Sequence, residues 1–167
     1  MWLVRIVRLG RWKDRNLSEA VKDLTPREGE LGLSVYRVAD DSESDDSEVT
    51  LVAILFALMR DRPDNLDYIL IPESLLISLG LEAEPVPTPE THPFLSERHY
   101  EIRGLAGDEA EETRLALARG IQTIVDFRGR RIPEKQLIEL VRAHAQRDQQ
   151  FRSHIKSPNW LSILEKY

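Results

Sequence analysis

The chain has 167 residues, of which 41% are hydrophobic and 31% are charged, and its formal net charge is −6 at pH 7. This length is enough for one domain with a full hydrophobic core, or for two small ones. The absence of cysteine excludes disulfides, cysteine nucleophiles and cysteine metal ligands, and it favours a reducing, cytoplasmic location. Residues 1–9 are interrupted by Arg5 and Arg8 and do not resemble a secretion signal.

The net charge conceals a segregation along the chain. Residues 1–30 hold seven basic and five acidic side chains, whereas residues 31–117 hold six basic and nineteen acidic ones. Residues 118–167 are basic again, with ten basic side chains against five acidic ones. An acidic centre between basic ends argues against nucleic-acid binding by the whole chain but is compatible with a local basic surface.

The first hundred residues alternate predicted strands and helices. β-branched and aromatic residues favour strands, whereas apolar residues at intervals of three and four favour helices. Arg5, Arg8 and Arg11 recur at intervals of three, which fits neither face of a strand and leaves its register open. The predicted strands are 2–9, 31–38, 66–71 and 98–103, and the predicted helices among them are 16–24, 47–60 and 72–79.

The most apolar run, from Leu51 to Met59, is predicted to be a buried helix around which the rest of the chain packs. Its composition of Ala, Leu, Met and Phe favours helix over strand. Asp46 or Ser47 is positioned to cap its N-terminus, and Pro63 follows its end. Nine apolar residues span about 13 Å as a helix, so we expect no membrane-spanning segment here.

The last sixty residues are predicted to be mainly helical. Helices are expected at 108–118 and 133–152, with Gly120 interrupting or ending the first, and 121–127 fits either helix or strand. Ser157 and Pro158 form an N-cap and a first helical position for a last helix. Residues 128–131, just before the helix expected at 133–152, are predicted to form a basic turn.

These elements predict an α+β or α/β fold. Strand–helix alternation indicates a small, partly parallel sheet of about four strands from residues 1–103, packed around the helix at 47–60. Four prolines between residues 84 and 93 predict an extended connector at 84–97. The connector would join an α/β core at 1–83 to a strand and helical region at 98–167, packed on the core as one domain.

Motifs for common chemistries are missing from the sequence. The glycine patterns of phosphate loops and dinucleotide sites, the nucleophile motif Gly-x-Ser-x-Gly and the zinc motif His-Glu-x-x-His do not occur. The acidic run 40–48 lacks the glycine of a calcium loop and reads as a solvated loop. We therefore expect no metal and no cofactor.

Two sets of side chains are compatible with a catalytic function. Four carboxylates lie near strand ends: Asp40, Asp41, Asp67 and Glu73. If they converged in the fold, they would form a metal-dependent site for an enzyme acting on a phosphorylated substrate. His99 and Glu101 share a strand face and form an acid–base pair, two metal ligands or a surface charge ladder. His144 lies on an apolar helix stripe, where a half-buried structural histidine is the default.

The basic turn is the sharpest candidate for a polyanion site. Arg128, Arg130 and Arg131 precede a helix start, where guanidinium groups and backbone amides together suit a phosphate. The alternative is that these arginines pair with the acidic middle of the same chain.

The function expected from these features is a small non-catalytic binding or adaptor protein acting through contacts with another protein. Trp12 and Trp160 look exposed in the sequence and are the candidate partner-binding residues. Two alternatives remain: a nucleic-acid-binding protein that uses the basic C-terminal helices, and an enzyme acting on a phosphorylated substrate.

Overall fold

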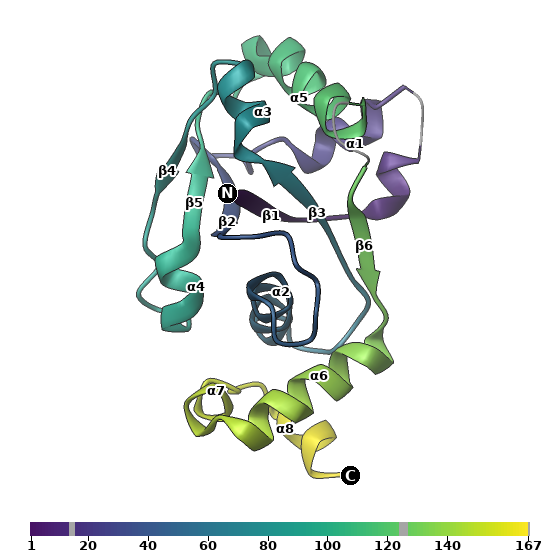
Figure 1. Cartoon of the computed structure of the whole chain (residues 1–167), viewed down its shortest axis with the longest axis vertical. Coiled ribbons are helices and arrows are strands. Elements are labelled where there is room, and N and C mark those ends of the chain that lie inside the picture. Colours follow the sequence, from purple (N-terminus) through teal and green to yellow (C-terminus); the bar gives the residue numbers. More distant parts are fainter. Residues whose placement is uncertain (14–15, 124–126, 167) are drawn as a thin grey trace.

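Residues 1–13, 16–123 and 127–166 are described in the computed structural model, and strands from this part of the chain form one sheet (Figure 1). Six strands lie in the order β4-β5-β2-β1-β3-β6, and every neighbouring pair is antiparallel. Their bounds are Trp2–Val7 (β1), Leu33–Val38 (β2), Leu66–Pro72 (β3), Ala83–Pro85 (β4), His99–Ile102 (β5) and Gly129–Ile132 (β6).

The α+β class is confirmed, but the prediction of a partly parallel sheet of about four strands is wrong. β2 and β3 are each antiparallel to β1, so they run in the same direction, as a strand–helix–strand unit requires. They do not pair with each other, because β1 lies between them. The strand–helix–strand pattern therefore holds for the directions of β2 and β3 but not for β1 and β2, which flank α1 and are antiparallel.

Two groups of helices cover the two faces of the sheet. In Figure 1, α1, α3 and α5 lie over one face, and α2 lies between the other face and the C-terminal helices. None of the helices in the described ranges has the length and apolar character needed to cross a bilayer. The helix bounds are Ser18–Asp23 (α1), Glu48–Leu58 (α2), Glu73–Ser78 (α3), Pro93–Arg98 (α4), Glu111–Thr123 (α5), Glu134–Arg147 (α6), Gln149–Ser153 (α7) and Pro158–Glu165 (α8), with short 3-10 turns at Leu9–Trp12 (η1) and Asp108–Ala110 (η2).

The central helix predicted at 47–60 is confirmed as α2. Ser47 caps it by accepting a hydrogen bond at Oγ from the Thr50 backbone N–H at 3.2 Å. One side of α2 packs on β1, β2 and β3, and the opposite side packs on α6, Phe151 and Trp160. Because both sides of the helix are covered by protein, an apolar run without amphipathic spacing is stable there.

The second core lies on the opposite face, under α1, α3 and α5. Gly120 was expected to interrupt or end a helix, but α5 continues through it to Thr123. A Cβ at Gly120 would lie 2.6 Å from the Leu75 side chain on α3. The glycine therefore permits close packing of two helices, and the helix stability that it costs is offset by that packing.

The segments expected to be a connector and a basic turn belong partly to regular structure. β4 pairs with β5, and α4 begins at Pro93, so residues 84–97 are not extended throughout. Gly129–Ile132 forms β6 at the edge of the sheet and not a turn. The helix expected at 133–152 is divided into α6 and α7, because Asp148 accepts hydrogen bonds from the Gln150 and Phe151 backbone N–H groups and caps a new helix.

Candidate anion-binding cleft

The central strands β1 and β2 separate part of the way along the sheet. Their ladder has three residue pairs and ends at Val4 and Tyr36. The same register, continued by two residues, would pair Ile6 with Ser34, but that pair is not part of the ladder. The Arg5 side chain, from β1, bonds to Ser34 instead: its Nη1 donates to the Ser34 carbonyl at 2.9 Å. A side chain thereby satisfies a strand carbonyl that would otherwise lack a partner.

The separation opens a cleft of about 580 Å³ at this end of the sheet, which we call the sheet cleft. It lies among the end of β1, the start of β2, the loop after α1 and the C-terminal end of α2. Its charged side chains are those of Arg5, Arg8, Asp23, Arg27, Glu30 and Arg60. Four guanidinium groups therefore face two carboxylates, in a chain that is acidic as a whole.

Asp23 at the end of α1 is buried and fully used by internal hydrogen bonds. Its carboxylate accepts from the Arg8 backbone N–H at 3.1 Å, from Arg11 Nη1 at 2.8 Å and from Trp12 Nε1 at 2.9 Å. The Asp23 backbone carbonyl accepts from Arg5 Nε at 3.0 Å. Burial lowers the pKa of the Arg5 guanidinium, and the charge of Asp23 opposes that shift.

A second hollow, of about 510 Å³, adjoins the sheet cleft and shares Arg8 and Arg60 with it. Arg62, Asp64, Asp67 and Arg131 also line this hollow. Asp67 at the start of β3 accepts two hydrogen bonds from Arg131, at 2.7 and 2.9 Å, and one from the Leu9 backbone N–H at 3.0 Å. The Arg131 side chain holds the pKa of Asp67 below its ordinary value.

Several arginines around the two hollows keep their positive charge uncompensated. Arg8, Arg27 and Arg62 are exposed and form no ion pair with any carboxylate in the described parts of the chain. Arg60 donates to the Asn65 carbonyl at 3.2 Å and lies over the Phe56 ring at 5.7 Å. It forms no ion pair with a carboxylate of the described residues, although its charge helps to lower the pKa of Asp67. These side chains form a site that favours an anion.

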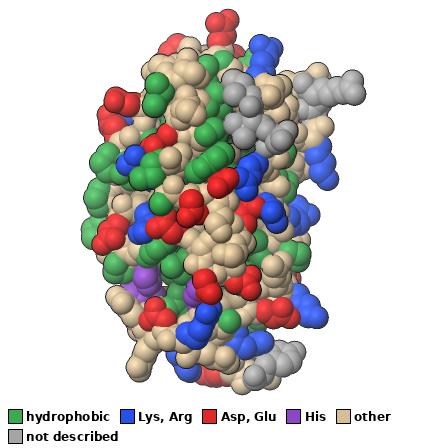
Figure 2. Space-filling view, in the orientation of Figure 1, with side chains coloured by type: hydrophobic (Ala, Val, Ile, Leu, Met, Phe, Trp, Pro, Cys, Tyr) green, Lys and Arg blue, Asp and Glu red, His purple; other side chains and the backbone are tan. Residues whose placement is uncertain are grey.

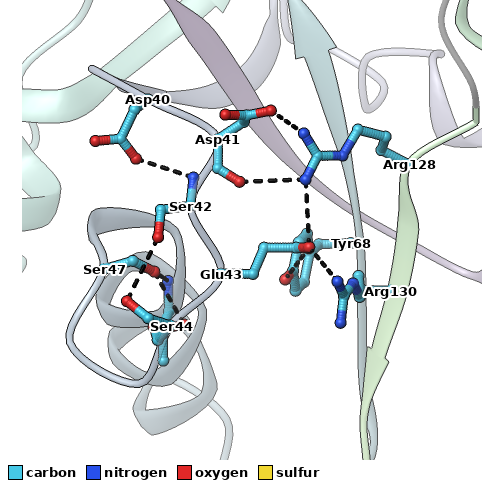
Figure 3. Close-up of polar contacts among 10 residues, drawn as sticks. Asp40, Asp41, Ser42, Glu43, Ser44, Ser47, Tyr68, Arg128 and Arg130 are labelled. Carbon is cyan, nitrogen blue, oxygen red and sulfur yellow. Dashed lines mark hydrogen bonds and ion pairs between the residues drawn. The ribbon is translucent and has the colours of Figure 1, made fainter.

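The predicted polyanion residues are instead engaged with the acidic loop at residues 40–48, which we call the acidic strap (Figure 3). Arg128 pairs with Asp41 and, at 3.4 Å, with Glu43. Arg130 pairs with Glu43 at 2.6 Å, and Tyr68 donates its hydroxyl to the same carboxylate at 2.7 Å. Burial raises the pKa of Tyr68, which keeps its hydroxyl protonated as a donor. The internal pairing that was the alternative is therefore present.

The structure separates the three predicted arginines. Arg128 and Arg130 hold the acidic strap, whereas Arg131 binds Asp67 and lines the second hollow. Acidic and basic side chains are interspersed over the face seen in Figure 2, and no extended patch of one sign is visible there. This mixed surface reflects pairing between the acidic middle and the basic end of the chain.

Both candidate partner-binding tryptophans are buried, so the expectation that they are exposed is wrong. Trp12 is 4% exposed and stacks on Phe127 with ring centroids 5.7 Å apart. Trp160 is fully buried beneath α2 and donates from Nε1 to the Arg60 carbonyl at 3.2 Å. Each indole has a large apolar surface that stabilises a core, and each N–H finds an internal acceptor.

The strand-end carboxylates do not converge. Asp40 accepts from the Ser42 backbone N–H, and Glu73 pairs with Arg37 at 2.9 Å; Asp41 and Asp67 bind the arginines described above. Within the described ranges, no group of three or more side chains is placed to hold a metal ion.

The histidine candidates occupy structural positions. Nδ1 of buried His99 lies 2.6 Å from the Val86 carbonyl, while Glu101 pairs with Arg103 at 2.8 Å. The two side chains therefore do not form an acid–base pair. Nε2 of His144 lies 3.2 Å from the Asp45 carbonyl and its ring contacts Phe151, which is a half-buried structural role.

Sequence reasoning missed the sheet cleft, although one signal was present. An arginine inside an apolar strand, repeated after three residues, indicated that the face pattern of β1 was disturbed. The other arginines come from separate segments and carry no joint signal in the sequence. No protein family, no curated protein and no solved structure matches this chain.

Proposed function

We propose that this protein is a non-catalytic binding protein whose ligand is anionic and occupies the sheet cleft. The observation that carries this proposal is the excess of arginines over carboxylates among the described residues that line the cleft. They are Arg5, Arg8, Arg27 and Arg60 against Asp23 and Glu30. Guanidinium groups are always charged and recognise carboxylates and phosphates through two hydrogen bonds at once. A cleft lined by one excess sign also raises the local concentration of ligands of the opposite sign.

Binding is favoured over catalysis by the state of the buried carboxylates. Asp23 and Asp67 already accept hydrogen bonds from arginine side chains and from backbone N–H groups. A general base needs a lone pair within reach of the proton that it removes. The contacts of these carboxylates suit a structural role, which supports a binding protein over an enzyme on a phosphorylated substrate.

The alternative of nucleic-acid binding through the C-terminal helices receives less support. Arg128 and Arg130 are paired with the acidic strap, and Arg147 pairs with Asp46 at 2.9 Å. Each of these pairs would have to be broken before the arginine bound a phosphate. The sheet cleft requires no such exchange, because Arg8 and Arg27 form no ion pair in the described structure.

The test is a titration of the whole chain with hexaglutamate and with inorganic pyrophosphate at two salt concentrations. The double variant Arg8→Ala/Arg27→Ala removes two cleft charges, and Arg119→Ala/Arg152→Ala removes two exposed charges elsewhere. We expect at least one anion to bind the parent and the control, and to bind the cleft variant at least about tenfold more weakly. Equal affinity of the two double variants, or no binding of either anion, contradicts the proposal.

A further inference from the structure

Two hydrogen-bond donors on residues that line the sheet cleft have no acceptor among the described residues. Arg5 uses Nε and Nη1 for backbone carbonyls, and its Nη2 has no partner among the described residues. The Tyr36 hydroxyl from β2 likewise forms no hydrogen bond with them. Neither atom is among the buried atoms without a partner, so both are accessible to solvent, and both residues line the cleft. They are positioned to donate to a ligand there.

The Tyr36 hydroxyl remains a donor over the whole physiological range. Burial raises the pKa of Tyr36, so the phenol stays protonated, and the nearby Arg5 cation only partly opposes this shift. A guanidinium group and a phenol that both line the cleft suit an anionic oxygen, because charge-assisted hydrogen bonds are about twice as strong as neutral ones.

The charge of the cleft matches a dianion better than a single carboxylate. Among the described residues, four arginines line it against Asp23 and Glu30, which leaves two positive charges in excess. Asp23 is further compensated by Arg11, which lies outside the lining. A phosphate monoester carries close to two negative charges at pH 7, and its three terminal oxygens accept hydrogen bonds from several directions. The donors come from β1, β2, the loop after α1 and the end of α2.

The rest of the cleft suits an organic body attached to that phosphate. The apolar side chains of Ile6, Pro26, Leu33, Phe56 and Met59 line its walls. Its volume of about 580 Å³ lies within the range of small-molecule sites, about 300–1,000 Å³, and exceeds what a bare phosphate needs.

From these observations, and resting on the proposed function, we infer that the ligand of the sheet cleft is a small organic phosphate monoester. Arg5 Nη2 and the Tyr36 hydroxyl bind its phosphate oxygens, and Arg8, Arg27 and Arg60 supply the surrounding positive charge. The apolar wall beside Phe56 contacts its organic part.

Phenyl phosphate and benzoate are a matched pair for the test, because they share a ring and differ in the anion. We titrate each into the whole chain, follow binding by ¹H–¹⁵N NMR, and expect shifts at residues of β1 and β2. Phenyl phosphate should bind at least about tenfold tighter than benzoate at pH 7.5, as expected for an added charge-assisted contact. Its affinity should fall between pH 7.5 and 5, because a phosphate monoester loses its second charge near a pKa of about 6. None of the described residues that line the cleft is a histidine, so benzoate affinity should stay constant over that range.

Three variants locate the site. Tyr36→Phe removes one hydroxyl, and Arg27→Ala removes one exposed charge; each should weaken phenyl phosphate by about tenfold. Arg119→Ala should leave the affinity unchanged. Benzoate binding as tightly as phenyl phosphate, or an unchanged affinity in both cleft variants, overturns the inference.

Failure of the inference and failure of the proposed function give different results. If hexaglutamate binds in a way that depends on Arg8 and Arg27 while phenyl phosphate does not bind, the phosphate inference is overturned and the proposed function stands. If neither ligand binds through those arginines, both are overturned.

Discussion

Arg5 Nη1 donates to the Ser34 carbonyl at 2.9 Å, at the point where the ladder between β1 and β2 ends. A cation thus bridges two strands that have separated, and it is held by neutral carbonyl groups and not by a carboxylate. Such an arginine stabilises the separation and leaves part of its guanidinium group facing the sheet cleft.

The first prediction concerns this bridge. Arg5→Ala leaves the carbonyls of Ser34 and Asp23 without their donor, and the two hydrogen bonds lost come from a charged group. We expect the free energy of unfolding in urea to fall by about 2–4 kcal/mol. Arg27→Ala, an exposed cleft arginine, should change it by less than about 0.5 kcal/mol. Similar stabilities of the two variants would show that the Arg5 bridge does not support the fold.

The second prediction concerns the central helix. Leu55 on α2 is 3% exposed and lies in the core between the sheet and the C-terminal helices. Leu55→Asp forces an unpaired charge into that core and should lower the free energy of unfolding by more than about 4 kcal/mol. Ile77→Asp is the control, because Ile77 is 76% exposed. A cooperative thermal transition of Leu55→Asp within a few degrees of the parent contradicts the assignment of α2 as the core helix.

The third prediction concerns the histidine that caps α4. His92 Nδ1 accepts from the Phe94 backbone N–H at 3.1 Å, so a neutral ring carries its proton on Nε2. Protonation would place a hydrogen on Nδ1 and remove the cap. Burial lowers the pKa of His92 from its ordinary value of 6.5, and the neighbouring His154, whose ring centroid is 4.5 Å away, lowers it further.

The lowered pKa of His92 determines how stability changes with pH. Below pH 6.5 the unfolded chain takes up a proton at His92 while the folded chain resists it, so the stabilising effect is complete above pH 6.5. It is lost progressively as the pH falls through the lowered pKa. His92→Asn retains a preferred N-cap residue and removes the titration. We expect thermal unfolding between pH 7.5 and 5.5 to depend less on pH in His92→Asn than in the parent; an equal dependence contradicts the prediction.

The fourth prediction concerns the acidic strap. Glu43 is 8% exposed and accepts from Tyr68 and Arg130, so Arg128→Ala/Arg130→Ala leaves a buried carboxylate with fewer partners. We expect the double variant to lose at least about 1 kcal/mol of stability in urea. The parent should show no oligonucleotide binding that depends on these two arginines, because the strap occupies them. If the double variant kept its stability and lost a salt-dependent oligonucleotide binding that the parent showed, the polyanion-site hypothesis would be supported instead.

Arg103→Ala is the matched control for the strap. Arg103 follows β5 and forms ion pairs with Glu84 on β4 and Glu101 on β5. Exposed pairs of this kind contribute about 0–1 kcal/mol, so Arg103→Ala should change stability less than the double variant does.

The candidate site was harder to predict from the sequence than the helices and strands were. Arg128, Arg130 and Arg131 cluster in the sequence, and their clustering indicated a ligand site. Their partners in the strap and at Asp67 lie more than sixty residues away along the chain, so only folding brings them together. The cleft arginines show the opposite case, because Arg8, Arg27 and Arg60 are separated in sequence and meet at one end of the sheet.

What the sequence by itself determined was local in origin. The apolar run 51–59 predicted a buried helix, and Ser47 and Ser157 specified helix starts because their side-chain hydroxyls accept from backbone N–H groups three residues later. Tertiary structure alone decided which strands are neighbours and where Trp12 and Trp160 are buried. Strand pairing and burial depend on contacts between distant segments, which local propensity and periodicity do not encode. The separation of β1 from β2, and with it the sheet cleft, is a consequence of that same long-range packing.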